Sequence, residues 1–150
     1  MYNVKDVANF VIFLANEKID KDFNTSEGIT HLKLQKILYF AQATYLACLN
    51  TKLFTEKILA YKYWPIVEEI FVQYKHTNTP LAFDKKVNFN IIKDKDKKNL
   101  KDIREYFGKY SAFQLVEMTH AHDPRKNTKP SNEISVSSMK SFYTWKISLS

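Results

Sequence analysis

The stretch that decides the fold is Thr30-His31-Leu32-Lys33-Leu34-Gln35-Lys36-Ile37-Leu38-Tyr39-Phe40-Ala41-Gln42, and its apolar pattern continues to about Leu49. Thr30 is a good N-cap residue, and Ile29 before it can pack against Leu34 one turn later. The spacing of the apolar residues therefore predicts a helix over residues 31–49.

The apolar side chains of this helix fall into two opposed stripes, at about 100° per residue. One stripe holds Leu34, Ile37, Leu38, Ala41, Tyr45 and Cys48, and the other holds Leu32, Tyr39, Ala43 and Leu46. The lines between them hold Lys33, Lys36 and Thr44 on one side and Gln35 and Gln42 on the other. A surface helix has one apolar stripe, so two stripes predict a central helix with neighbours on both sides. We expect Leu38 and Leu46 to be buried, and Lys36 to snorkel along its neighbours or to pair with an acid.

Weaker helical patterns surround this central segment. They run over about residues 4–18, 97–107 and 136–147, where apolar residues recur at helical spacing. Asn3 is a good N-cap for the first of these helices. Gly108 follows the second and is predicted to stop it in the C′ position.

Two further helix starts are marked by capping residues. Ser111 and Gln114 form a capping box, which predicts a helix beginning at Ser111. Pro65 suits the first position of another helix, and Glu68 and Glu69 would then lie near its positive end.

Two short segments carry strand signals. Residues 57–63 are rich in Tyr, Ile and Leu and are predicted to be a strand or an extended segment. Residues 87–92 alternate apolar and polar side chains, a weak strand signal that leaves open a small β-hairpin with residues 57–62. The predicted fold is mainly α: a compact bundle of about six helices around a central helix at about 31–49, with or without that hairpin.

Length and composition bound the class of protein. A chain of 150 residues is predicted to form a single domain, 1–150, and its 45% apolar and 26% charged residues are ordinary for a globular protein. Cys48 is the one cysteine, which excludes an internal disulfide framework and a Cys-rich zinc site and fits a reducing compartment. The longest apolar run, residues 10–15, is too short to cross a membrane. We expect a cytoplasmic protein without a signal peptide or a membrane partner.

The charge balance is basic and uneven. The chain carries 23 basic and 16 acidic residues, and residues 84–104 and 125–150 each have a net charge of +4. A basic region can attract nucleic acid, but base reading favours arginine, and only Arg104 and Arg125 are present. The charges of residues 93–98 alternate in sign, which is typical of a solvated loop. A solvated surface is therefore favoured, and a nucleic-acid-associated regulator is the alternative.

No catalytic constellation is recognisable. With glycines only at Gly28 and Gly108, the chain cannot form a Gly-rich phosphate loop. His120, His122 and Asp123 are three potential metal ligands within four residues, but no second cluster completes a site, and a role at a helix end is favoured. We therefore predict no enzyme activity, no catalytic residue, no metal site and no cofactor.

Three segments, in this order and spacing, resemble the Panacea domain, which is found in SocA-like antitoxins and phage-associated proteins. The first runs from Thr30 to Gln42 and is similar to the family pattern T-x-L-K-L-Q-K-L-L-Y-Y-A-Q. The second, Ala60-Tyr61-Lys62-Tyr63-Trp64-Pro65-Ile66-Val67, is similar to A-x-x-Y-G-P-V. The third, Ser111-Ala112-Phe113-Gln114-Leu115-Val116-Glu117-Met118-Thr119-His120, is similar to S-x-x-x-L-x-x-x-T-H.

This resemblance implies a mainly α-helical, non-enzymatic protein that binds a cognate toxin. It would neutralise the toxin by direct contact or deliver it to a protease. Trp64 departs from the family by replacing a glycine, and Arg125 stands where the family often has Trp. Aromatic side chains are enriched at interface hot spots, so the predicted partner-binding residues are Tyr61, Tyr63, Trp64 and Pro65. A core position for Trp64 is the alternative.

Overall fold

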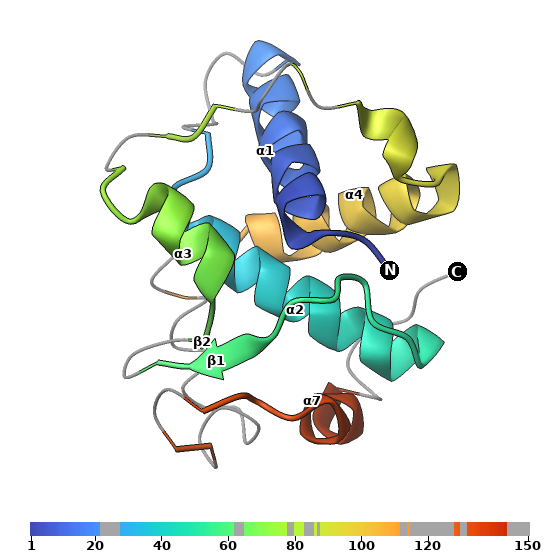
Figure 1. Cartoon of the computed structure of the whole chain (residues 1–150). Helices are drawn as coiled ribbons and strands as arrows, with labels where there is room; N and C mark the ends of the chain where they lie inside the picture. Colours follow the sequence, from blue (N-terminus) through green and yellow to red (C-terminus); the bar gives the residue numbers. More distant parts are fainter. Residues whose placement is uncertain are drawn as a thin grey trace.

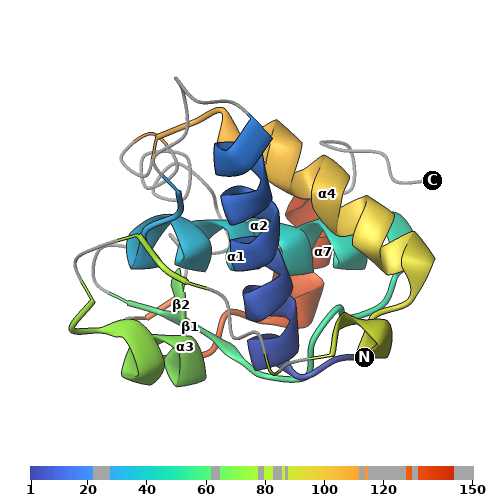
Figure 2. The ribbon, with the colours of Figure 1, turned by 90° about the horizontal axis from the view of Figure 1, so that it is seen from above.

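The computed structural model describes residues 1–21, 28–61, 65–77, 80–82, 86, 88–111, 114, 128–129 and 132–143. Among these, helix α2 (His31–Leu49) occupies the middle of the molecule (Figure 1). Helices α1 (Val4–Lys21) and α4 (Asp94–Gly108) lie on one side of it, and α7 (Val136–Tyr143) lies on the other. Seen from above, α1 runs steeply across α2 (Figure 2). The predicted mainly α fold around a central helix is confirmed.

The ends of α2 follow the local signals in its sequence. The Oγ1 atom of Thr30 accepts a hydrogen bond from the backbone N–H of Lys33 at 3.3 Å, which confirms the predicted N-cap. At the other end, Asn50 takes the left-handed conformation with φ 54°, which asparagine tolerates better than most residues. Every side chain from Leu34 to Leu46 is buried, so the helix has no solvent-facing line over that length.

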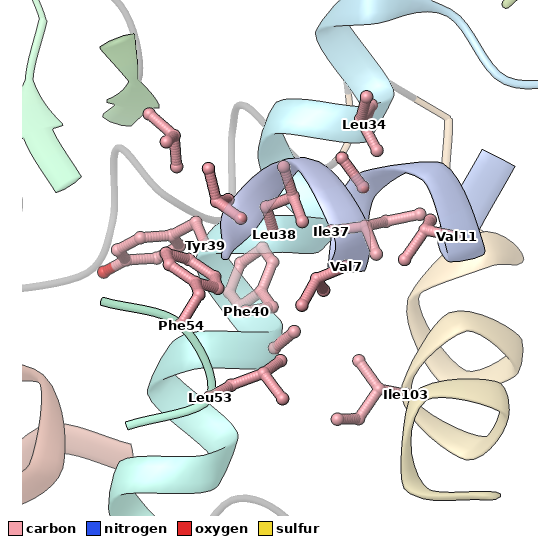
Figure 3. Close-up of a cluster of buried hydrophobic side chains, with 14 of the residues drawn as sticks. Val7, Val11, Leu34, Ile37, Leu38, Tyr39, Phe40, Leu53, Phe54 and Ile103 are labelled. Carbon is pink, nitrogen blue, oxygen red and sulfur yellow. The ribbon is translucent and has the colours of Figure 1, made fainter. Parts of the chain in front are cut away.

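The core forms on both sides of α2. Val7 and Val11 of α1, Ile103 of α4, and Leu53 and Phe54 after α2 gather around Ile37, Leu38 and Phe40 (Figure 3). The rings of Phe40 and Phe107 stack at 4.4 Å between centroids. Leu38 is 0% exposed and Leu46 is 3% exposed, as the two-stripe pattern predicted. The burial of both leucines follows from the position of α2 between its neighbours.

A small antiparallel hairpin is present, but its second strand is not the one considered from the sequence. Strand β1 (Ile58–Ala60) pairs with β2 (Pro65–Val67), with Ile58 opposite Val67. The other edge of β1 bonds the backbone of residues 132–134, through Ala60 N to Asn132 O at 2.8 Å and Ile134 N to Ile58 O at 2.8 Å. Both edges of β1 are therefore occupied.

Residues 89–91 form a single 3₁₀ turn, so the strand expected within 87–92 is wrong for the described part of that segment. The Asn88 side chain accepts a hydrogen bond from Asn90 N at 2.9 Å and begins the turn. The ring of Phe89 packs against Phe10 and Phe13 of α1, with centroids 5.4 and 4.9 Å away. The cap from Asn88 and the packing of Phe89 therefore favour a 3₁₀ turn over the strand that the short alternating pattern predicted.

The predicted role of Pro65 as the first residue of a helix is also wrong. Pro65 opens β2, and α3 (Glu68–Tyr74) begins three residues later. The backbone groups of Pro65 and Val67 bond side chains of α2, which keeps this segment extended. Glu68 and Glu69 do lie in the first turn of α3, as expected.

Helix α4 is longer at its start than predicted. It begins at Asp94, so residues 94–98 are helical rather than a solvated loop, and Asp94 and Asp96 stabilise the positive end of the helix. Gly108 is its last residue rather than its C′ residue. The Nζ atom of Lys33 donates to the Gly108 carbonyl at 2.7 Å, which satisfies a helix-end acceptor without a left-handed glycine.

The capping predictions elsewhere are confirmed. Lys5 N donates to Asn3 Oδ1 at 2.8 Å at the start of α1. Ser111 N donates to Gln114 Oε1 at 2.8 Å, and Gln114 N donates to Ser111 Oγ at 3.1 Å, which completes the capping box. The rest of the predicted helix after Gln114 and the predicted helical residues 144–147 lie outside the described residues. None of the described helices is both long enough and apolar enough to cross a membrane.

Candidate partner interface

The structure describes two of the four residues that the sequence predicts to bind a partner. Tyr61 directly follows β1 and is 39% exposed. Pro65 is the buried first residue of β2. Tyr63 and Trp64 lie outside the described residues. The partner-binding role of all four residues stays a prediction.

Tyr61 belongs to a group of aromatic rings that come from three parts of the chain. Its ring lies 5.8 Å from that of Phe71 on α3, and Phe71 lies 5.8 Å from His31 at the start of α2. His31 in turn lies 6.1 Å from Tyr74. His31, Phe71 and Tyr74 are partly exposed. We call His31, Tyr61, Phe71 and Tyr74 the aromatic face.

Helix α3 supplies the polar and apolar surroundings of this face. Ile70 is fully buried and fixes the inner side of α3, while Val72 is 61% exposed on its outer side. Glu68 and Glu69 are exposed in the first turn, on a chain whose net charge is +7. A contiguous exposed apolar patch is typical of a protein-binding surface, and Val72 adds exposed apolar area to the helix that carries Phe71 and Tyr74.

Helix α3, which carries two rings of the aromatic face, follows directly from β2, and α2 holds β2 by side-chain hydrogen bonds. Val67 N donates to Gln35 Oε1 at 2.8 Å, and Gln35 Nε2 donates to Val67 O at 3.1 Å. Lys36 Nζ donates to Pro65 O at 3.3 Å. These two side chains occupy the edge of β2 that faces away from β1, in the place of a third strand. Both are buried, so the edge is sealed from water.

Gln42 binds a second extended segment in the same way. Leu53 N donates to Gln42 Oε1 at 2.8 Å, and Gln42 Nε2 donates to Phe54 O at 3.0 Å. The opposite edge of this segment bonds the backbone of Tyr2, through Tyr2 N to Leu53 O and Thr55 N to Tyr2 O. The segment is thereby fixed on both sides.

The sequence placed Gln35, Lys36 and Gln42 between the apolar stripes but did not reveal their burial. Gln35 and Gln42 are each 1% exposed, and Lys36 is 0% exposed, so Lys36 does not snorkel to solvent. The overlooked signal is the pair of stripes itself. When a helix is covered on both sides, the residues between its two apolar stripes have little access to solvent. Long polar side chains at these positions can instead bond the backbone of neighbouring strands.

A second polar group lies at the other end of α2. Asp96 of α4 is 7% exposed, and its two oxygens accept hydrogen bonds from the hydroxyls of Tyr2 and Tyr45, the latter at 2.6 Å. Asn99 Nδ2 donates to the Tyr45 hydroxyl at 3.3 Å. Burial, followed by the bond to Asp96, raises the pKa of Tyr45. These contacts tie the start of the chain, α2 and α4 together.

This polar group forms one wall of a pocket of about 380 Å³. Lys52, Lys93 and Lys95 also line the pocket, beside Leu49 and Leu53. Tyr2 and Tyr45 already occupy both oxygens of Asp96. The carboxylate therefore serves as a structural link between elements, in contrast to the solvated position that the sequence favoured for residues 93–98.

Metal ligands and basic patches do not gather into a second site among the described residues. No group of three or more His, Cys, Asp or Glu side chains in these ranges is arranged to hold a metal ion. His120, His122 and Asp123 lie outside them, as does most of the basic region 125–150. On α4, exposed lysines at 95, 98 and 101 are flanked by exposed acids at 94, 102 and 105.

Comparison with known proteins places the chain in a family. Residues 34–124, more than half of the chain, match the family model described as "Antitoxin SocA-like, Panacea domain". This range includes Tyr61, Phe71 and Tyr74 of the aromatic face, together with Gln35, Lys36 and Gln42. Neither the search of curated proteins nor that of solved structures returned a match. The chain thus belongs to the antitoxin SocA-like Panacea domain family.

Proposed function

We propose that this chain is a cytoplasmic, single-domain antitoxin that neutralises a partner toxin by direct, stoichiometric binding without turnover. The observation that carries the proposal is the family match over residues 34–124, because an antitoxin family implies a toxin partner. Delivery of the bound toxin to a protease is the second form of this function. Both forms require a surface that binds the toxin.

The aromatic face is the surface that we assign to the toxin. Tyr and Phe rings give large contact areas with few rotatable bonds, so binding immobilises little side-chain freedom. Tyr61 is exposed, and Phe71 and Tyr74 are partly exposed, while β2, from which α3 continues, is held by buried side chains of α2. Such support reduces the ordering that binding would otherwise cost. Tyr63 and Trp64 are proposed to bind the toxin as well, and the buried Pro65 to hold the start of β2 in place.

The experiment is rescue of growth by co-expression. The toxin to use is the product of the neighbouring gene, provided that its expression alone stops growth. Tyr61→Ala and Val72→Asp should abolish rescue and weaken binding of the purified toxin at least tenfold, about 1.4 kcal/mol or more. Tyr106→Ala and Ile91→Asp are matched controls, since Tyr106 is 44% exposed and Ile91 is 54% exposed on other parts of the chain.

Several results would overturn the proposal. The antitoxin function fails if the neighbouring product is harmless alone and the purified chain binds no protein partner. The assignment of the face fails if all four variants rescue growth equally well. If neutralisation requires an added protease, and the toxin disappears as growth recovers, the protein acts by delivering the toxin to the protease and not by blocking it directly.

The alternative function is a small nucleic-acid-associated regulator. The net charge of +4 in residues 84–104 and again in 125–150 favours it. The exposed acids that flank the lysines of α4 weaken it, because neighbouring carboxylates repel phosphates.

A further inference from the structure

His31 belongs to the aromatic face and also contacts Gln35, the side chain that holds β2. It is the first residue of α2, and its ring lies 5.8 Å from that of Phe71 and 6.1 Å from that of Tyr74. Its Nε2 atom is 3.2 Å from Gln35 Nε2. One side chain therefore contacts both α3 and the glutamine that holds β2.

The backbone of Val67 fixes the orientation of the Gln35 amide. The Val67 N–H is a donor, so the atom that faces it at 2.8 Å must be the amide oxygen. The amide nitrogen then faces Val67 O at 3.1 Å, as a donor requires. The flipped amide would set two donors against each other and two acceptors against each other, which excludes it.

This orientation fixes the protonation state of His31. The Gln35 amide nitrogen has two hydrogens, of which one goes to Val67 O and the other points to His31 Nε2. Nε2 must therefore accept, which requires a neutral imidazole whose proton is on Nδ1.

We propose that His31, as a neutral Nδ1–H imidazole, is a positioning residue for the aromatic face and that its protonation weakens toxin binding; the second half rests on the proposed function. Protonated Nε2 would direct an N–H at the Gln35 amide hydrogens. Gln35 would then have to turn away from His31 or release Val67. Val67 is the N-cap residue of α3, so Phe71 and Tyr74 would lose part of their fixed position.

The charges around His31 favour the neutral form. Partial burial, with a smaller effect from the charge of Lys36 on the same helix, lowers the pKa of His31. Tyr74 is the titratable group on α3 that packs against the ring, and β2 carries no charged residue. The nearest acids on α3, Glu68 and Glu69, are exposed to solvent. These surroundings therefore favour the uncharged imidazole.

The first test uses the free, full-length protein and needs no toxin. A long-range ¹H–¹⁵N NMR spectrum of ¹⁵N-labelled protein at neutral pH distinguishes the protonated ring nitrogen from the unprotonated one. We expect the unprotonated nitrogen of His31 to be Nε2. Gln35→Met should shift the population toward the Nε2–H tautomer. An Nε2–H tautomer or a charged ring in the natural sequence would contradict the inference.

The second test measures toxin binding against pH with four proteins. If only the neutral form binds, the apparent affinity of the natural sequence should fall about twofold at the pKa of His31 and about tenfold one unit below it. His31→Gln keeps an acceptor near the Nε2 position and does not titrate, so its affinity should change much less with pH. His31→Leu removes the acceptor and should bind weakly at every pH. His76→Gln, at an exposed histidine, should keep the natural profile.

The two tests separate the inference from the proposed function. The expected tautomer without any toxin binding would leave the geometry intact and overturn the function. Toxin binding whose pH profile is unchanged in His31→Gln would overturn the positioning role while leaving the antitoxin function in place.

Discussion

Gln35 and Gln42 lie seven residues apart on α2, and each uses both ends of its amide to hydrogen-bond the backbone of an extended segment. Two helical turns separate them by about 10.5 Å along the axis. Gln35 binds β2 at Val67, and Gln42 binds residues 53–54. The central helix thus supplies side-chain partners for backbone groups that would otherwise be buried without them.

Replacing either glutamine should therefore destabilise the fold. Gln35→Met or Gln42→Met keeps the length of the side chain but leaves at least two buried backbone groups without these partners. Each such group costs about 1–3 kcal/mol, so we expect a loss of about 2–6 kcal/mol in the free energy of unfolding, measured in urea. Gln73→Met, at an exposed glutamine of α3, should change it by less than about 0.5 kcal/mol. Equal small losses in all three variants would contradict this role.

The two faces of α2 can be tested with one leucine from each. Leu38 and Leu46 are buried in different stripes, so Leu38→Ala and Leu46→Ala should each cost about 2–5 kcal/mol in unfolding free energy. Ile91→Ala, at an exposed side chain, provides the control. A helix with only one packed face would show a small loss in one of the two leucine variants.

The bonds to Asp96 predict a loss of stability at alkaline pH. Burial raises the pKa of Tyr45 in the folded protein above its ordinary value of about 10. The unfolded chain then releases this proton first, so stability is full below about pH 10 and falls as the pH rises further. Unfolding free energies measured between about pH 8 and pH 11 should show this decline. In Tyr45→Phe the decline should be shallower, and an identical slope would contradict the prediction.

Binding to DNA is expected to be weak and to vanish with added salt. Exposed lysines without arginine forks give counterion release but little base recognition. Fluorescence anisotropy with duplex DNA at two salt concentrations measures this dependence. Submicromolar, sequence-selective binding at physiological salt, lost on reversing the charges of Lys95, Lys97 and Lys98, would instead favour the nucleic-acid regulator.

The central helix could be predicted because its signals are local. Thr30, the apolar spacing and the two stripes all lie within one segment, and the structure confirms the bounds 31–49. The start of β2 at Pro65 could not be predicted, since its extended form depends on Gln35 and Lys36, about thirty residues away. Asp96 was misjudged for the same reason: Tyr2 and Tyr45, which bury it, are distant in sequence.

The candidate interface was predictable in part. Tyr61 stood out as one of several aromatic residues in the segment before Pro65, and it is exposed. His31, Phe71 and Tyr74 join it only because the fold brings the starts of α2 and α3 together. Their contribution to one face depends on tertiary contacts, for which a single sequence carries no periodic signal.

The most direct test of the central claim is a calorimetric titration of the purified toxin from the neighbouring gene with this protein, alongside an assay of toxin activity and without any protease. We predict saturation at a fixed stoichiometric ratio, with toxin activity lost in parallel, full binding by Tyr106→Ala and at least tenfold weaker binding by Tyr61→Ala. Undiminished toxin activity at saturation, or the absence of measurable binding, would contradict neutralisation by direct contact.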